Sequence, residues 1–138
     1  MQALIQALIG EITDDAPLAA IFGAAPAVYL GEAPESAALP LIILRLGVGR
    51  ISYDFSGDQM AQVPVDFQII AADMNIALTG AQRVATLLNK ATLTLSAGSL
   101  LACFRTAPIQ PAMPGFNSLL KALYTAGVRL ECQVFNAA

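Results

Sequence analysis

Histidine and tryptophan are absent from this chain of 138 residues, and charged side chains are scarce. Without histidine, the chain cannot form a Ser-His-Asp triad, a Cys-His pair or a His-ligated metal site. Only 12% of the residues are charged, about half the usual share of a soluble domain. This amount of charge is too small to cover the surface of an isolated monomer. We therefore expect much of the surface to contact other subunits.

Basic charge in particular is low, because seven Lys and Arg stand against ten Asp and Glu, which leaves a net charge of −3. This balance argues against binding nucleic acid by phosphate neutralisation. The distribution is also uneven. Residues 1–38 contain five acidic residues and no basic one, whereas the remaining hundred contain five acidic and seven basic residues. Patches of opposite sign on neighbouring subunits are therefore a further expectation.

Long hydrophobic runs are missing as well. A membrane helix needs about 20 apolar residues, but the run at 39–44 ends at Arg45 and the run at 100–104 ends at Arg105. The first residues, Met-Gln-Ala-Leu, lack the basic start of a signal peptide. We therefore expect no contact with membranes and a chain that folds in the cytoplasm.

Cysteine is limited to Cys103 and Cys132, which have apolar neighbours. Two cysteines do not make a disulfide framework, so both are interpreted as buried core thiols in a reducing compartment. A reactive Cys103 is the alternative, because Arg105 lies two residues further along a predicted strand and shares its face.

The chain length predicts one domain over residues 1–138. Apolar spacing predicts a helix over 1–16, followed by a short turn at 18–22 that ends at Gly23. Short apolar runs predict strands at 27–30 and 41–46, the second covered on both faces. Residues 61–69 alternate between apolar and polar side chains, which predicts a half-buried strand. Pro64 lies on its polar face and predicts an edge strand or a bulge there.

Asp73 is a predicted N-cap for an Ala-rich helix that ends near Lys90. A hairpin is expected from 92–95 and 100–107, then a stiff proline-rich loop at 108–115 and a closing alternating strand over 124–134. The expected fold class is α+β, with a mostly antiparallel sheet of four to five strands and two helices packed on one face.

Candidate catalytic and ligand-binding groups are few. The adjacent pair Asp14-Asp15 is expected to be a polar turn rather than a catalytic dyad. The run Gly47-Val48-Gly49-Arg50 lacks the Lys-Ser/Thr ending and the following helix of a phosphate loop, so it is interpreted as a plain turn. Asp66 and Asp73 have no third carboxylate with which to hold a cation. We therefore predict no catalytic residue, metal or cofactor.

The segment 50–58, called the tip below, is the best candidate for a contact surface. Its aromatic residues Tyr53 and Phe55 lie between Arg50 and the acidic residues Asp54 and Asp58. An apolar centre with a charged rim is typical of a specific interface. Pro64, at the expected sheet edge, joins this candidate surface. In the alternative interpretation, the tip folds back and caps the sheet.

The order of these elements resembles a known family. It consists of an Ala/Leu helix, a short Val-Tyr strand, Leu39-Pro40-Leu41-Ile42-Ile43-Leu44, a loop with Tyr53 to Asp58, the long alternating strand ending near Ala72-Asp73, an Ala-rich helix through Arg83-Val84, Leu93-Thr94-Leu95, and a close on Thr125 to Glu131. This pattern is similar to the tail terminator, or tail completion, proteins of long-tailed bacteriophages and gene transfer agents, also called minor tail or tail-to-head joining proteins.

The resemblance implies a non-enzymatic virion protein of the tail neck that forms a homo-oligomeric ring, typically a hexamer. Such a ring ends growth of the tail tube and joins it to the head-tail connector or stopper protein, while genomic DNA passes through the lumen without sequence-specific binding. The proline-rich segment 107–117 does not map onto the family pattern. Two other classes stay open at this point: a small thiol enzyme that uses Cys103, and a carrier of an apolar small molecule.

Overall fold

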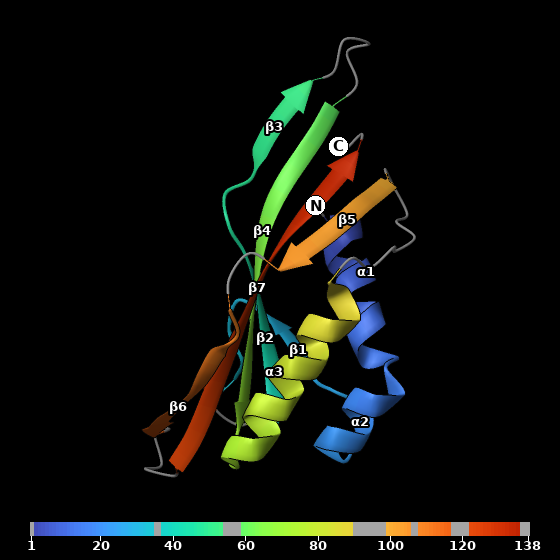
Figure 1. Cartoon of the computed structure of the whole chain (residues 1–138). Helices are drawn as coiled ribbons and strands as arrows, with labels where there is room; N and C mark the ends of the chain where they lie inside the picture. The colour runs from blue at the N-terminus through green and yellow to red at the C-terminus, as the bar shows by residue number, and fades with distance from the viewer. Residues whose placement is uncertain are drawn as a thin grey trace.

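The computed structural model describes residues 2–34, 37–53, 59–89, 99–105, 108–116 and 122–135 (Figure 1). These residues form three helices and seven strands. In chain order they are α1 (Gln2–Thr13), α2 (Ala16–Phe22), β1 (Val28–Leu30), β2 (Leu41–Leu46), β3 (Arg50–Tyr53), β4 (Gln59–Ala71), α3 (Met74–Leu88), β5 (Ser99–Arg105), β6 (Gln110–Phe116) and β7 (Ala122–Phe135).

All seven strands belong to one sheet, in which the order β1-β2-β4-β7-β5 is extended by β3 beside β4 and by β6 beside β7. Only β1 and β2 run parallel among the described strand pairs. The expected α+β class with a mostly antiparallel sheet is therefore confirmed. The sheet has seven strands rather than the expected four to five. The number is higher because β2 and β3 both pair with β4, and β5 and β6 both pair with β7.

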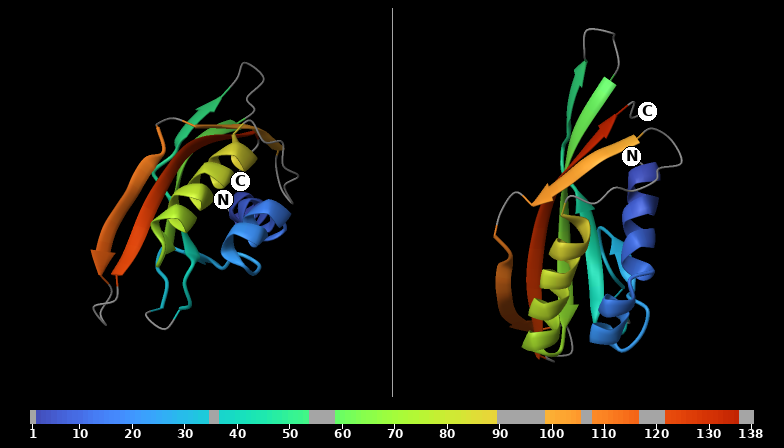
Figure 2. Two further views of the ribbon diagram at one scale, coloured as in Figure 1. Left: turned by 60° about the horizontal axis from the view of Figure 1, so that its bottom comes forward. Right: turned by 45° about the vertical axis from the view of Figure 1, so that its right-hand side comes forward.

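The two long strands β4 and β7 form the centre of the sheet and pair from Met60–Phe135 to Ala71–Tyr124. Their inward side chains are apolar and buried, as the alternation in 61–69 predicts: Ala61, Val63, Val65, Phe67 and Ile69 on β4, and Ala126, Val128, Leu130, Cys132 and Val134 on β7. All three helices lie on this side of the sheet (Figure 2). Burial of the alternate residues thus fixes the register, because a slip by one residue would expose every apolar group.

Close packing of α3 on the sheet depends on its small residues. Asp73 caps this helix by accepting hydrogen bonds from the backbone of Asn75 and Ile76. A Cβ added to Gly80 would lie 3.0 Å from Phe22 Cε1 of α2 and 3.2 Å from Ile69 Cγ2 of β4. Glycine therefore lets α3, α2 and β4 meet at one point, as the Ala-rich face predicted.

Of the two alternatives predicted for Pro64, the edge strand is wrong, because β4 has partners on both sides, and a bulge lies opposite Pro64 instead. Pro64 lies opposite the segment between β2 and β3, both of which pair with β4. Leu46 pairs with Val65 and Arg50 with Gln62, so four steps along one strand match three along the other. One extra residue in 47–49 forms a bulge. The sheet tolerates proline here because its missing N–H points at this interruption rather than at a regular ladder.

Three further expectations change. The turn at 18–22 is the short helix α2, which ends at Gly23 with a positive φ of 77°. The proline-rich loop at 108–115 contains strand β6, in which the register shifts between Gln110 and Met113. Pairing along β7 keeps these prolines extended. The expected strand at 92–95 lies outside the described residues.

Candidate assembly surface

One face of the sheet lies opposite the helices and is called the outer face here. The alternation of β4 and β7 places polar side chains on it: Gln62, Asp66 and Gln68 from β4, and Arg129, Glu131 and Gln133 from β7, all of them partly or fully exposed. At the end where β2 begins, Ala33, Pro34, Ala37 and Leu39 lie beside this face, and Leu41 and Ile43 are buried there. The prediction that β2 is covered on both faces is thereby confirmed.

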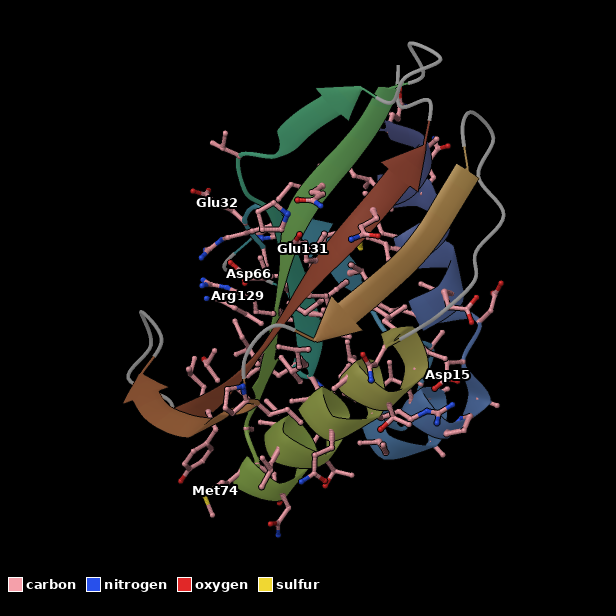
Figure 3. All side chains as sticks on the ribbon, turned by 45° about the horizontal axis from the view of Figure 1, so that its top comes forward. Asp15, Glu32, Asp66, Met74, Arg129 and Glu131 are labelled. Atoms are coloured by element: carbon pink, nitrogen blue, oxygen red, sulfur yellow. The ribbon has the colours of Figure 1, made fainter. Side chains whose placement is uncertain are left out.

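A row of three charges crosses the middle of the outer face. Arg45, Asp66 and Arg129 occupy directly opposite positions on β2, β4 and β7. Arg129 donates from Nε to Asp66 Oδ1 over 2.8 Å and from Nη2 to Asp66 Oδ2 over 3.3 Å (Figure 3). The hydrogen bond to Asp66 raises the pKa of Arg129. Because both side chains are well exposed, the pair orients the groups more than it stabilises the fold.

Arg45 has a different partner. Its Nε donates to the backbone oxygen of Gly31 over 3.2 Å, which connects β2 to the segment that follows β1. The guanidinium of Arg45 is exposed on the outer face. The two ion pairs found among the described residues are Asp66–Arg129 and Asp15–Arg83. Arg45 therefore forms no ion pair among the described residues.

An apolar side chain stands out at the bulge between β2 and β3. Val48 is 97% exposed and lines a hollow with Gln62, Pro64 and Glu131 on the outer face. Its two neighbours are pressed against β4: a Cβ on Gly47 would lie 2.8 Å from Pro64 Cγ, and a Cβ on Gly49 would lie 2.8 Å from the backbone oxygen of Gln62. Glycine on each side thus lets the bulge run close beside β4 and leaves Val48 exposed.

Sequence reasoning missed Val48, although the signal was present. The run Gly47-Val48-Gly49-Arg50 was weighed only as a phosphate loop or a plain turn, and it is a bulge followed by strand β3. A lone apolar residue between two glycines is poorly placed to reach a core. Opposite a proline within a long alternating strand, this pattern indicates a bulge that displays the residue.

The predicted tip is only partly within the described residues. Arg50 and Tyr53 begin and end β3, opposite Gln62 and Gln59 of β4. Asp54, Phe55 and Asp58 lie outside the described residues. Pro64 is brought near Val48, two positions along β4 from the residue that pairs with Arg50. The role of the tip as a contact surface stays a prediction.

Hollows among the described residues are small. One at the start of β2 measures about 180 Å³ and is lined by Leu41, Ile43, Ile70 and Leu123 among others. Another, beside Asp66 and Arg129, measures about 130 Å³, and the hollow at Val48 measures about 290 Å³. Pockets that hold small ligands usually span roughly 300–1,000 Å³. The two smaller hollows fall below this range, and the hollow at Val48 lies at its lower limit.

Of the two cysteines, Cys132 is the one whose side chain lies in the described part of the structure. Cys132 is fully buried in the core. Cys103 lies in β5, where Arg105 takes the register position opposite Leu130. No cluster of three His, Cys, Asp or Glu side chains that could hold a metal occurs among the described residues. Likewise, none of the helices described is long and apolar enough to cross a membrane.

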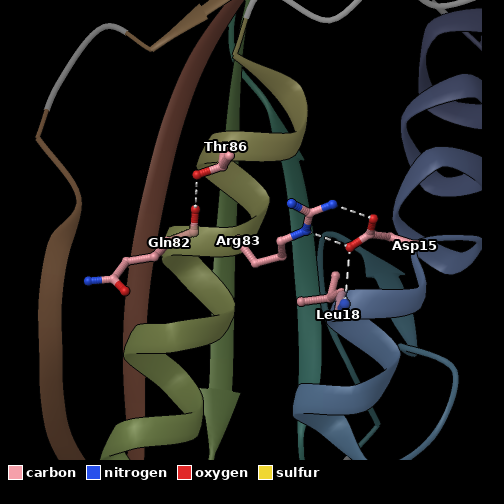
Figure 4. Close-up of polar contacts among 5 residues, drawn as sticks. All are labelled: Asp15, Leu18, Gln82, Arg83 and Thr86. Atoms are coloured by element: carbon pink, nitrogen blue, oxygen red, sulfur yellow. Dashed lines mark hydrogen bonds and ion pairs between the residues drawn. The ribbon is translucent and has the colours of Figure 1, made fainter.

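The acidic pair near the start of the chain has the structural role predicted for it. Asp15 is the N-cap of α2 and accepts from the backbone N–H of Leu18 over 3.0 Å. The same carboxylate binds Arg83 of α3 (Figure 4). Asp14 is exposed beside it. Asp15 therefore connects two helices.

Comparisons with known proteins give one kind of match. No protein-family model matches the chain, and no curated protein sequence matches it. Among solved structures, a chain in the virion of a native gene transfer agent (GTA) particle has a similar fold, with a TM-score of 0.68 and 21% sequence identity. The likeness covers 97% of this chain and 96% of that chain. The chain thus shares its whole fold, end to end, with a component of a phage-like particle.

Proposed function

We propose that this chain is a structural protein of a phage-like virion and has no enzymatic activity. The observation that carries the proposal is the likeness to the GTA virion chain, which extends over nearly the full length of both chains. The scarcity of charge, with 12% charged residues, fits a subunit that buries much of its surface in an assembly.

Within such a particle, we propose the role of tail terminator. Copies of the chain form a ring, a hexamer in the proposed assembly, at the head-proximal end of the tail in the neck region. The ring stops growth of the tail-tube protein and joins the tube to the head-tail connector or stopper protein. Genomic DNA passes through its lumen without sequence-specific contacts, in keeping with a net charge of −3.

The outer face and the tip supply the proposed contacts. Val48 and Pro64 give an apolar centre, and Arg45, Asp66, Arg129 and Glu131 give a charged surround. The predicted tip residues Arg50, Tyr53, Asp54, Phe55 and Asp58 are proposed as further contacts of the subunit. An apolar centre within a polar rim has the anatomy of a specific protein interface. The outer face differs from the helical side of the molecule. A contact that joins these two different surfaces on neighbouring copies is head-to-tail and can close into a ring.

Assembly of the purified chain tests the proposal. Light scattering and negative-stain electron microscopy are applied to the full chain alone and with tube protein from the same particle. We expect closed rings, either in solution at high protein concentration or at tube ends, and tubes of limited length. A chain that stays monomeric in both conditions, and leaves tube length unchanged, contradicts the proposed role.

A further inference from the structure

The only two cysteines of the chain occupy directly opposite positions in the sheet. Cys103 of β5 pairs with Cys132 of β7 in a register that is regular from Ala102–Gln133 to Arg105–Leu130. They are separated by 28 intervening residues in the sequence, and nothing in the sequence predicts their meeting. Sequence reasoning treated them as two independent core thiols. The register makes them a pair.

The hydrogen-bonding phase of the sheet brings this pair closer. Gly47 N–H donates to the Pro64 carbonyl over 2.8 Å, so the backbone groups of Pro64 point away from β7. Along a strand, successive residues point their backbone groups to opposite sides, so Val63 points toward its β7 partner, Cys132. The backbone groups of Cys132 then point away from β5. Cys103 and Cys132 form a non-hydrogen-bonded pair, in which the Cα atoms lie about 4.5 Å apart.

That separation suits a disulfide, whose Cα atoms are usually about 4.4–6.8 Å apart. In an antiparallel pair, directly opposite residues also share one face of the sheet. For Cys132 this is the buried face that carries Leu130 and Val134. Both requirements, distance and common face, are therefore met by the backbone register alone.

We propose that Cys103 and Cys132 are a disulfide-forming pair that links β5 to β7 under oxidising conditions. With glutathione disulfide as the oxidant, one cysteine thiolate attacks it and releases one glutathione. The second cysteine thiolate then attacks the mixed disulfide and releases another. The two cysteines lose two electrons and two protons, which the two glutathione molecules carry away. In a reducing cytoplasm the pair stays as thiols.

The bond would stabilise one end of the sheet. It closes a segment from 103 to 132 that contains β6 and the proline-rich residues around it. Its first strand, β5, pairs with β7 on one side and ends the described strand order on the other. Closing a loop of this length restricts the unfolded chain, which raises the unfolding temperature of a domain of this size by about 10 °C. In a subunit outside the cell, the disulfide would hold β5 against β7, although no further described strand pairs with β5 on its other side.

Oxidative refolding of the full chain tests the pair, because unfolding first gives the oxidant access to the buried position. The protein is refolded in a glutathione redox buffer, its remaining thiols are alkylated in denaturant, and the intact mass is measured. We expect both cysteines to escape alkylation. Trypsin, cutting after Lys90, Arg105 and Arg129, should release residues 91–105 joined to residues 130–138 until reductant is added. The thermal midpoint of this form should exceed that of the reduced form by about 10 °C.

Cys103→Ala and Cys132→Ala are the matched controls. Each should fold, and each should show the same thermal midpoint with and without oxidant. Two alkylated cysteines after oxidative refolding, or linkage only between chains, overturns the proposal. An oxidised form no more stable than the reduced form overturns its stabilising role. Ring assembly is scored separately, so this result does not depend on the proposed function.

Discussion

Arg83 of α3 and Asp15, the N-cap of α2, form a two-point ion pair: Nε lies 2.8 Å from Oδ2 and Nη2 lies 2.7 Å from Oδ1. The Asp15 side chain is only 7% exposed and that of Arg83 is 29% exposed. The same carboxylate also caps α2. One side chain thus starts a helix of seven residues and fixes it to α3, the helix that packs on the centre of the sheet.

This pair predicts an acid-sensitive contribution to stability. The hydrogen bond from Arg83 lowers the pKa of Asp15 below its ordinary value, against the opposing effect of burial. A lowered pKa in the folded state means that the stabilisation is present above about pH 4 and is lost as the pH falls through the folded pKa. Asp15→Asn keeps a good cap but loses the charge. We expect it to cost about 2 kcal/mol at neutral pH, with the difference from wild type narrowing in acid.

Denaturant unfolding from neutral to acid pH measures this effect. Asp14→Asn is the matched control, because Asp14 is the exposed neighbour and should change stability by less than about 0.5 kcal/mol. If the cost of Asp15→Asn were the same at every pH, the charge of Asp15 would not be its cause.

Gly49 is predicted to be irreplaceable at the bulge. A Cβ there would lie 2.8 Å from the backbone oxygen of Gln62, which cannot rotate away. Gly49→Ala should therefore destabilise the chain by about 1–3 kcal/mol. Gly10→Ala, within α1, is the opposite case, since nothing lies within 4 Å of the added group and alanine favours a helix by about 1 kcal/mol. The unfolding temperatures of the two variants should move in opposite directions. An unchanged unfolding temperature for Gly49→Ala would contradict the close approach of Gly49 to β4.

Val48 should matter for assembly and not for folding. At 97% exposure, its replacement by serine should alter monomer stability by less than about 0.5 kcal/mol. If Val48 contacts another subunit, ring formation should weaken by about 1 kcal/mol or more. Met74, 52% exposed at the start of α3, provides the control variant Met74→Ser on another part of the surface. Sedimentation over a concentration series compares the two, and equal effects would remove Val48 from the interface.

The aromatic residues of the tip give a related prediction. Replacing both Tyr53 and Phe55 with alanine should leave the monomer folded, because loop tips tolerate change. It should weaken subunit association by about 2 kcal/mol or more if the rings are anchors. Melting temperature, ring formation and tail capping are measured together. A collapsed melting temperature would instead place the rings in the core, and unchanged assembly would direct attention to the segment 108–115.

Local patterns in the sequence were sufficient for much of the fold. Alternation placed Val63 and Phe67 on the buried face, and Asp73 marked the start of α3, because periodicity and capping act over a few residues. Partner choice could not be predicted in the same way. That the bulge at Pro64 lies in the neighbouring strand, or that Cys103 lies opposite Cys132, depends on which distant strands pair. Even β6, with three prolines or glycines in seven residues, is a strand because β7 is there to pair with it.

The candidate site was less predictable than the fold for the same reason. The outer face is defined by the packing of the helices on the opposite face of the sheet. No local sequence motif predicts it. Arg45, Asp66 and Arg129 are far apart in sequence and form a row because three strands align them. The sequence could suggest the aromatic tip, which is a local pattern and stays a prediction. It did not suggest Val48, whose exposure follows from the bulge between β2 and β3.

The pairing of β4 with β7 has a mechanical consequence. Twelve successive residue pairs join the two strands, a length of about 40 Å, while every other strand accompanies only part of it. Figure 1 shows this ladder running from the helix-covered end to the end where β3 and β5 extend beyond α3. A load applied at one end is carried along the whole ladder as shear, which many hydrogen bonds must resist at once. The subunit is thus built as a beam, stiff along its length, with its flanking strands free to differ at each end.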